Sequence, residues 1–64
     1  MFEATFVKKD GLKNTEVGSP HHLRASTLSE AEEEALRLPR PAGANFIKLS
    51  RIGGLVEREI GFDL

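Results

Sequence analysis

The stretch Phe46–Phe62, FIKLSRIGGLVEREIGF, decides the fold class because it has the pattern of a β-hairpin. Gly53-Gly54 can fill a two-residue type I′ or II′ turn between two runs that favour strands. The register that follows pairs Ile47 with Ile60, Lys48 with Glu59, Leu49 with Arg58, Ser50 with Glu57, Arg51 with Val56 and Ile52 with Leu55.

This register gathers the apolar residues of the hairpin on one face, with Phe62 further along: Ile47, Leu49, Val56 and Ile60. A slip of one residue would set Ile47 opposite Glu59, so the alternation favours the register above. The other face gains a cross-strand ion pair between Lys48 and Glu59.

Before the hairpin, the stretch Thr27–Pro41, TLSEAEEEALRLPRP, has the signals of a helix. Thr27 followed by Glu30 fits a capping box, with Ser29 and Glu32 as the alternative box. Proline disfavours helical geometry at the residue before it, so Pro39 and Pro41 end the helix. The sequence therefore predicts a helix at 28–38, followed by a rigid connector at 39–45.

The predicted helix is amphipathic apart from one residue. At 100° per residue, an apolar face contains Leu28, Ala31, Ala35 and Leu38, and most of the glutamates lie opposite. Capping, the helix dipole, an i, i+4 pair of Glu33 with Arg37, and solvent exposure explain those glutamates. Leu36 lies off the apolar face, beside Glu32. It either covers the edge of the sheet within its own chain or contacts a partner chain.

The N-terminal segment alternates with period two, and Phe2, Ala4 and Phe6 share one side. This pattern predicts a strand at 2–8. The Asp10-Gly11 step that follows favours a tight turn. A second strand is expected within 12–26. LKNTEV at 12–17 is one candidate, but it lacks a clean apolar face, so 22–26 is favoured because Leu23 and Ala25 alternate, with a loop at 18–21.

Together these elements predict an α+β fold, in which one helix packs on an antiparallel sheet of three to four strands. The element order is strand, strand, helix, strand, strand, within a single small domain at 1–64. A chain of 64 residues with four Phe, no Trp and no Cys has a thin core and no disulfide to support it. We therefore expect a homodimer.

Few residues offer catalytic chemistry. His21 and His22 are adjacent, so a strand would send them to opposite sides, and no Cys or further His completes a metal site. The serines lack a G-x-S-x-G motif, and RIGGL lacks the phosphate-binding pattern of G-x-x-x-x-G-K. We expect a protein that is not an enzyme and that has no metal or cofactor. Leu36 is the one candidate site residue, as part of a protein interface.

The charge pattern gives no clear nucleic-acid footprint, because the net charge is −1 and no segment is strongly basic. A patch could form if Lys8, Lys9 and Lys13 shared a sheet with Lys48, Arg51 and Arg58, but Glu57 and Glu59 would dilute it. No apolar run approaches the length of a membrane span, and no signal-peptide pattern occurs. The expected location is the cytoplasm.

The stretch STLSEAEEEAL at 26–36 resembles the strand-to-helix step of small antitoxin-like domains, where a T-x-x-E-A helix follows a sheet. The first functional hypothesis is a small non-catalytic protein-interaction module that self-associates. The alternative is a nucleic-acid-linked or antitoxin-like accessory protein.

Overall fold

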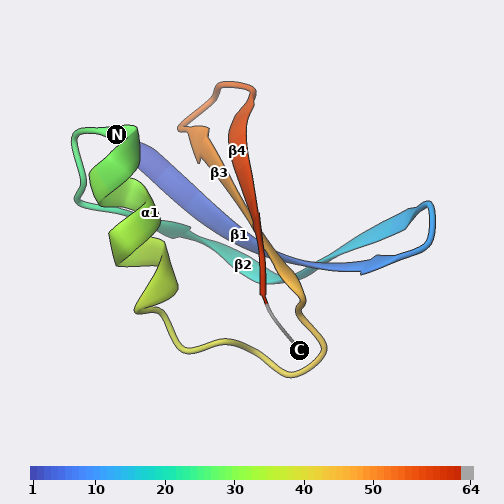
Figure 1. Cartoon of the computed structure of the whole chain (residues 1–64). Helices are drawn as coiled ribbons and strands as arrows, with labels where there is room; N and C mark the ends of the chain where they lie inside the picture. The colour runs from blue at the N-terminus through green and yellow to red at the C-terminus, as the bar shows by residue number, and fades with distance from the viewer. Residues whose placement is uncertain (63–64) are drawn as a thin grey trace.

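The computed structural model describes residues 1–62 and shows a four-stranded antiparallel sheet with one helix on one face (Figure 1). The elements are β1 (Phe2–Asp10), β2 (Lys13–His22), α1 (Leu28–Leu36), β3 (Phe46–Arg51) and β4 (Val56–Gly61). The strand order is β2-β1-β3-β4, so the two hairpins meet where β1 pairs with β3. This arrangement confirms the predicted α+β class and the predicted order of elements.

The core lies between α1 and the two central strands. Alternate residues of β1 and β3 point toward the helix and are almost fully buried: Phe2, Ala4, Phe6, Ile47 and Leu49. Ala31 and Ala35 face them from α1 with no exposed surface, and their small side chains let the helix lie close to the sheet. Leu28 and Leu38 pack at the margins, as the helical face predicted.

The start of α1 follows the predicted cap. Thr27 Oγ1 accepts a hydrogen bond of 3.2 Å from the backbone N–H of Glu30. The Glu30 carboxylate accepts from the hydroxyls of Ser26 and Thr27, not from a backbone N–H as in a full capping box. The helix ends two residues earlier than predicted, because Arg37 is its C-cap and Leu38 N–H donates to the carbonyl of Ala35 in a tighter turn.

The second strand lies within the predicted range 12–26, but its preferred placement at 22–26 was wrong. The strand runs over Lys13–His22, and it includes the segment 18–21 that was expected to be a loop. Gly18, at φ +78°, starts a bulge in which residues 18–20 oppose Thr5 alone, so the register resumes with Ala4 opposite His21. Leu23 and Ala25 alternate because they pack in the core from the link between β2 and α1.

The C-terminal hairpin turns at Gly53-Gly54 as predicted, and its register is correct from Ile47–Ile60 to Leu49–Arg58. Nearer the turn the prediction was wrong, since Ser50 pairs with Val56 and a bulge follows in β4. The β-turn spans Arg51–Gly54, with Gly53 at φ +76°. This longer loop leaves Val56 48% exposed, outside the apolar face to which it was assigned.

The face of the sheet away from α1 is covered by the protein's own charged side chains. Lys9 crosses β3 to reach Glu59 at 2.8 Å, and its ammonium lies 4.3 Å from the centre of the Phe46 ring. Lys48 crosses β1 to reach Glu16 at 2.9 Å. The predicted Lys48–Glu59 ion pair is thus replaced by two longer-range pairs. Their alkyl stems shield this face, where Val7 is buried.

Candidate protein-interaction site

Leu36 lies on the flank of α1 that faces β4, and 56% of its surface is exposed. The backbone of α1 lies against β1 and β3 but not against β4, among residues 1–62. An open groove of about 480 Å³ therefore runs between α1 and β4. We call it the α1–β4 groove, and its lining includes Ser29, Glu32, Glu33, Leu36, Arg58 and Ile60.

The groove has an apolar part and a charged part. Leu36 and the partly buried Ile60 supply the apolar surface. Arg58 Nη1 lies 2.8 Å from Glu32 Oε1, so one ion pair joins the helix to the strand across the groove. Glu33 is exposed and has no ion-pair partner in the described part of the chain. The carboxylates of Glu32 and Glu33 and the guanidinium of Arg58 give the groove a formal charge of −1. The carboxylate of Glu59 does not add to it, because it lies on the other face of the sheet, paired with Lys9.

β4 is an edge strand, and it is less protected than the opposite edge. The edge strand β2 carries Pro20 and the bulge at Gly18, both of which hinder pairing with another chain. β4 contains no proline, and its pairing with β3 is regular from Arg58 to Gly61. Backbone N–H and C=O groups on its outer side are therefore available beside the groove.

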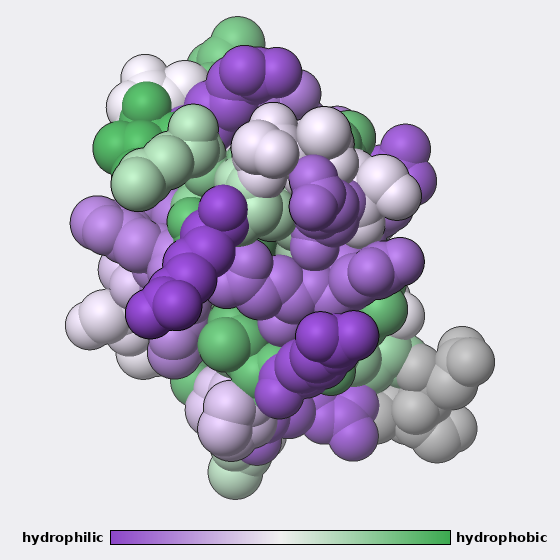
Figure 2. All heavy atoms as spheres, turned by 90° about the vertical axis from the view of Figure 1, so that its left-hand side faces the viewer, coloured by the Kyte–Doolittle hydropathy of each residue, from purple (hydrophilic) through white to green (hydrophobic). Residues whose placement is uncertain are grey.

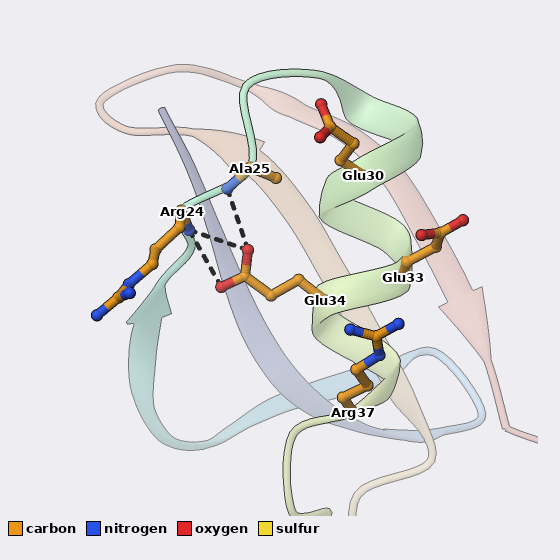
Figure 3. A pocket seen from close by; sticks show the side chains of 6 residues that line it. All are labelled: Arg24, Ala25, Glu30, Glu33, Glu34 and Arg37. Atoms are coloured by element: carbon orange, nitrogen blue, oxygen red, sulfur yellow. Dashed lines mark hydrogen bonds between the residues drawn. The ribbon is translucent and has the colours of Figure 1, made fainter.

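A second hollow, of about 360 Å³, lies on the opposite flank of α1 (Figure 3). There the Glu34 carboxylate accepts hydrogen bonds from the backbone N–H groups of Arg24 (3.0 and 3.1 Å) and Ala25 (3.0 Å). The side chain of Arg24 points away from the helix, and those of Glu30 and Glu33 point outward (Figure 3). The contacts of Glu34 make this hollow a structural joint between α1 and the link from β2.

Glu34 corrects the sequence interpretation, which assigned all the helix glutamates to capping, dipole and solvent roles. Its carboxylate is half-buried and holds the link between β2 and α1 in place. The sequence carried no signal for this role, because residues 22–26 were expected to be a strand with its own backbone partners. The predicted Glu33–Arg37 pair does not form an ion pair within residues 1–62.

The residues considered for chemistry do not come together. His21 contacts the Phe6 ring edge-on at 5.7 Å, and His22 Nε2 lies 3.6 Å from Glu3 on the other face. The two histidines therefore point to opposite sides of β2, as their adjacency predicted. Ser26 bonds Glu30 near the helix start, and Ser50 lies opposite Val56, not Glu57 as predicted. Within residues 1–62, no three metal-ligating side chains are grouped.

Exposed apolar side chains occur in two further places. Leu12 is fully exposed at the turn between β1 and β2. Four others form a group near the β3–β4 turn, which we call the turn cluster: Met1, Ile52, Leu55 and Val56. From the α1 side, hydrophilic residues dominate the surface, and hydrophobic surface appears in separate patches between them (Figure 2).

The basic residues of the two hairpins share one sheet, but most already have carboxylate partners. Lys9, Lys48, Arg51 and Arg58 pair with Glu59, Glu16, Glu57 and Glu32 at 2.7–2.9 Å. Lys8 and Lys13 are the two hairpin lysines without an ion pair in the described residues. Most of the basic charge of the two hairpins is therefore neutralised within the described residues.

Comparison with family models, with curated proteins and with solved structures finds no match for this chain. No family match thus accompanies the resemblance of 26–36 to antitoxin-like domains. In the described part of the chain, α1 is far too short and too polar to cross a bilayer.

Proposed function

We propose that this protein is a non-catalytic protein-interaction module that self-associates through the α1–β4 groove. The observation that supports the proposal best is the exposed Leu36, which lines a groove together with Ile60 beside the edge strand β4. Apolar surface of this kind gains free energy when another chain excludes water from it. A thin core in a short chain adds a reason to recruit a second subunit.

Leu36 alone does not supply enough energy for a stable complex. Full burial of a leucine contributes about 1.5–3 kcal/mol, and Leu36 has only about half of its surface left to bury. A micromolar complex requires about 8 kcal/mol. The interface must therefore include the backbone groups of β4 or further apolar side chains of the second chain.

Sedimentation equilibrium over a concentration series tests the proposal. We expect the wild-type protein to self-associate and Leu36→Arg to weaken the association, because a charge replaces the apolar contact. Leu55→Arg is the matched control, since Leu55 is 89% exposed in the turn cluster, away from the groove. A wild-type protein that stays monomeric through the high-micromolar range contradicts the proposal, as does a defect confined to Leu55→Arg.

A nucleic-acid-linked accessory role is the second candidate. It is favoured by Lys8 and Lys13, which are exposed on the same hairpin and have no ion pair within residues 1–62. Phosphate binding by these lysines would weaken as salt rises. The test measures binding to duplex and single-stranded DNA and RNA at about 0.05 M salt. An absence of binding there removes this candidate.

A further inference from the structure

The β1–β2 hairpin extends beyond the rest of the sheet as an arm (Figure 1). The pairing of β1 with β3 ends at Val7, whereas its pairing with β2 continues to Asp10 opposite Lys13. We call residues 8–15 the arm. Gly11, at φ +63°, supplies the turn geometry, and Leu12 beside it is fully exposed. The fold makes no use of an apolar side chain at this tip.

The base of the arm is held firmly. The Asn45 side chain accepts from the backbone N–H of Lys9 at 2.8 Å and donates to its carbonyl at 3.0 Å. Asn45 N–H also donates to the carbonyl of Val7 at 3.0 Å. The Lys9–Glu59 ion pair adds a contact to β4. A braced hairpin loses little conformational freedom when its tip binds, so Leu12 is presented at a low entropic cost.

The tip of the arm complements the α1–β4 groove in polarity and in charge. Leu12 offers an exposed apolar side chain, and Leu36 and Ile60 offer an apolar surface to receive it. Lys9 is already paired with Glu59, so the charge that the arm can offer comes from Lys8, Asp10 and Lys13, a formal charge of +1. The groove has a formal charge of −1, from Glu32, Glu33 and Arg58, and Glu33 is free of ion pairs within residues 1–62. Beside the turn cluster, the charges of Arg51 and Glu57 are already paired with each other at 2.7 Å.

We propose that the occupant of the groove is the arm of a second copy of this chain. This proposal rests on the proposed function and names the two surfaces that meet. Leu12 of one copy inserts between Leu36 and Ile60 of the other. Lys8 and Lys13 of the first copy then approach the carboxylates that line the α1–β4 groove of the second. Reciprocal insertion closes a dimer, whereas one-way insertion gives a ring or a chain of copies.

Two variants that each lack one surface test the proposal by complementation. Leu12→Arg keeps an intact groove, and Leu36→Arg keeps an intact arm. We expect each variant alone to associate roughly tenfold or more weakly than the wild type, since each loses the burial of a leucine. An equimolar mixture should form a heterodimer, because the intact arm of one variant fits the intact groove of the other. Circular dichroism checks that both variants fold.

The outcomes separate this proposal from the proposed function. A monomeric wild type overturns both. A mixture that stays monomeric, or a Leu12→Arg variant that associates like the wild type, overturns only the arm-in-groove contact. Leu55→Arg serves as the control in the same assay. If Leu55→Arg were the one variant that failed to associate, the contact would lie at the turn cluster. Because charges meet at the rim, association should also weaken between about 0.05 M and about 0.5 M salt.

Discussion

The two flanks of α1 both carry glutamates, but one flank lies beside the link from β2 and the other lies beside β4. On one flank Glu34 bonds the backbone N–H groups of Arg24 and Ala25, so the joint to β2 is closed. On the other flank, within residues 1–62, the Glu32–Arg58 ion pair is the one that reaches β4, and Leu36 remains exposed. A glutamate becomes structural where the neighbouring backbone lacks partners, and a leucine stays exposed where the helix does not cover the sheet.

The largest expected effect concerns the core beneath both flanks. Leu49→Ala removes a fully buried side chain under α1, and we expect the free energy of unfolding to fall by about 2–5 kcal/mol. Urea denaturation of monomeric protein measures the change. Leu55→Ala is the control, with an expected change below about 0.5 kcal/mol because Leu55 is exposed. Equal effects at the two positions would show that α1 does not rest on this core.

A smaller effect is expected at the closed flank. Glu34→Ala leaves two backbone N–H groups of the link without their acceptor, and stability should fall by about 1–3 kcal/mol. Glu33→Ala is the matched control on the same helix, since Glu33 has no hydrogen bond or ion pair through its side chain in the described residues. If both variants lose the same free energy of unfolding, the carboxylate of Glu34 does not hold the link between β2 and α1 against the helix.

The smallest effect on stability is expected at the open flank. Leu36→Ser should change the unfolding free energy of the monomer by less than about 0.5 kcal/mol, because surface substitutions rarely cost more. The same variant should weaken self-association, measured by sedimentation. A loss of about 2 kcal/mol or more in the monomer would instead place Leu36 in the core and remove it as a binding residue.

Local patterns in the sequence identified the helix and the strands whose formation depends mainly on residues close to them in the chain. The alternation of β1, the apolar face of α1 and the two glycines of the C-terminal hairpin each predicted the correct element. β2 was misplaced because an edge strand that is exposed along most of its length has no apolar alternation to reveal it. The two extra residues of its bulge also made the segment at 18–21 look like a loop.

The candidate site was only partly predictable for a related reason. Helical geometry separated Leu36 from the core face, and the structure places it in the α1–β4 groove. The β4 side of the groove could not be predicted, since it depends on how far α1 extends over the sheet. The roles of Glu34 and Asn45 were also hidden, because each bonds backbone groups that become neighbours only after folding.

The most direct test of the account is a dilution series followed by ¹H–¹⁵N correlation spectra of the wild-type protein. We expect concentration-dependent amide shifts at two separate surfaces, residues 11–13 of the arm and the groove residues near Leu36 and Ile60. Shifts confined to the turn cluster, or spectra that do not change with concentration, would contradict it.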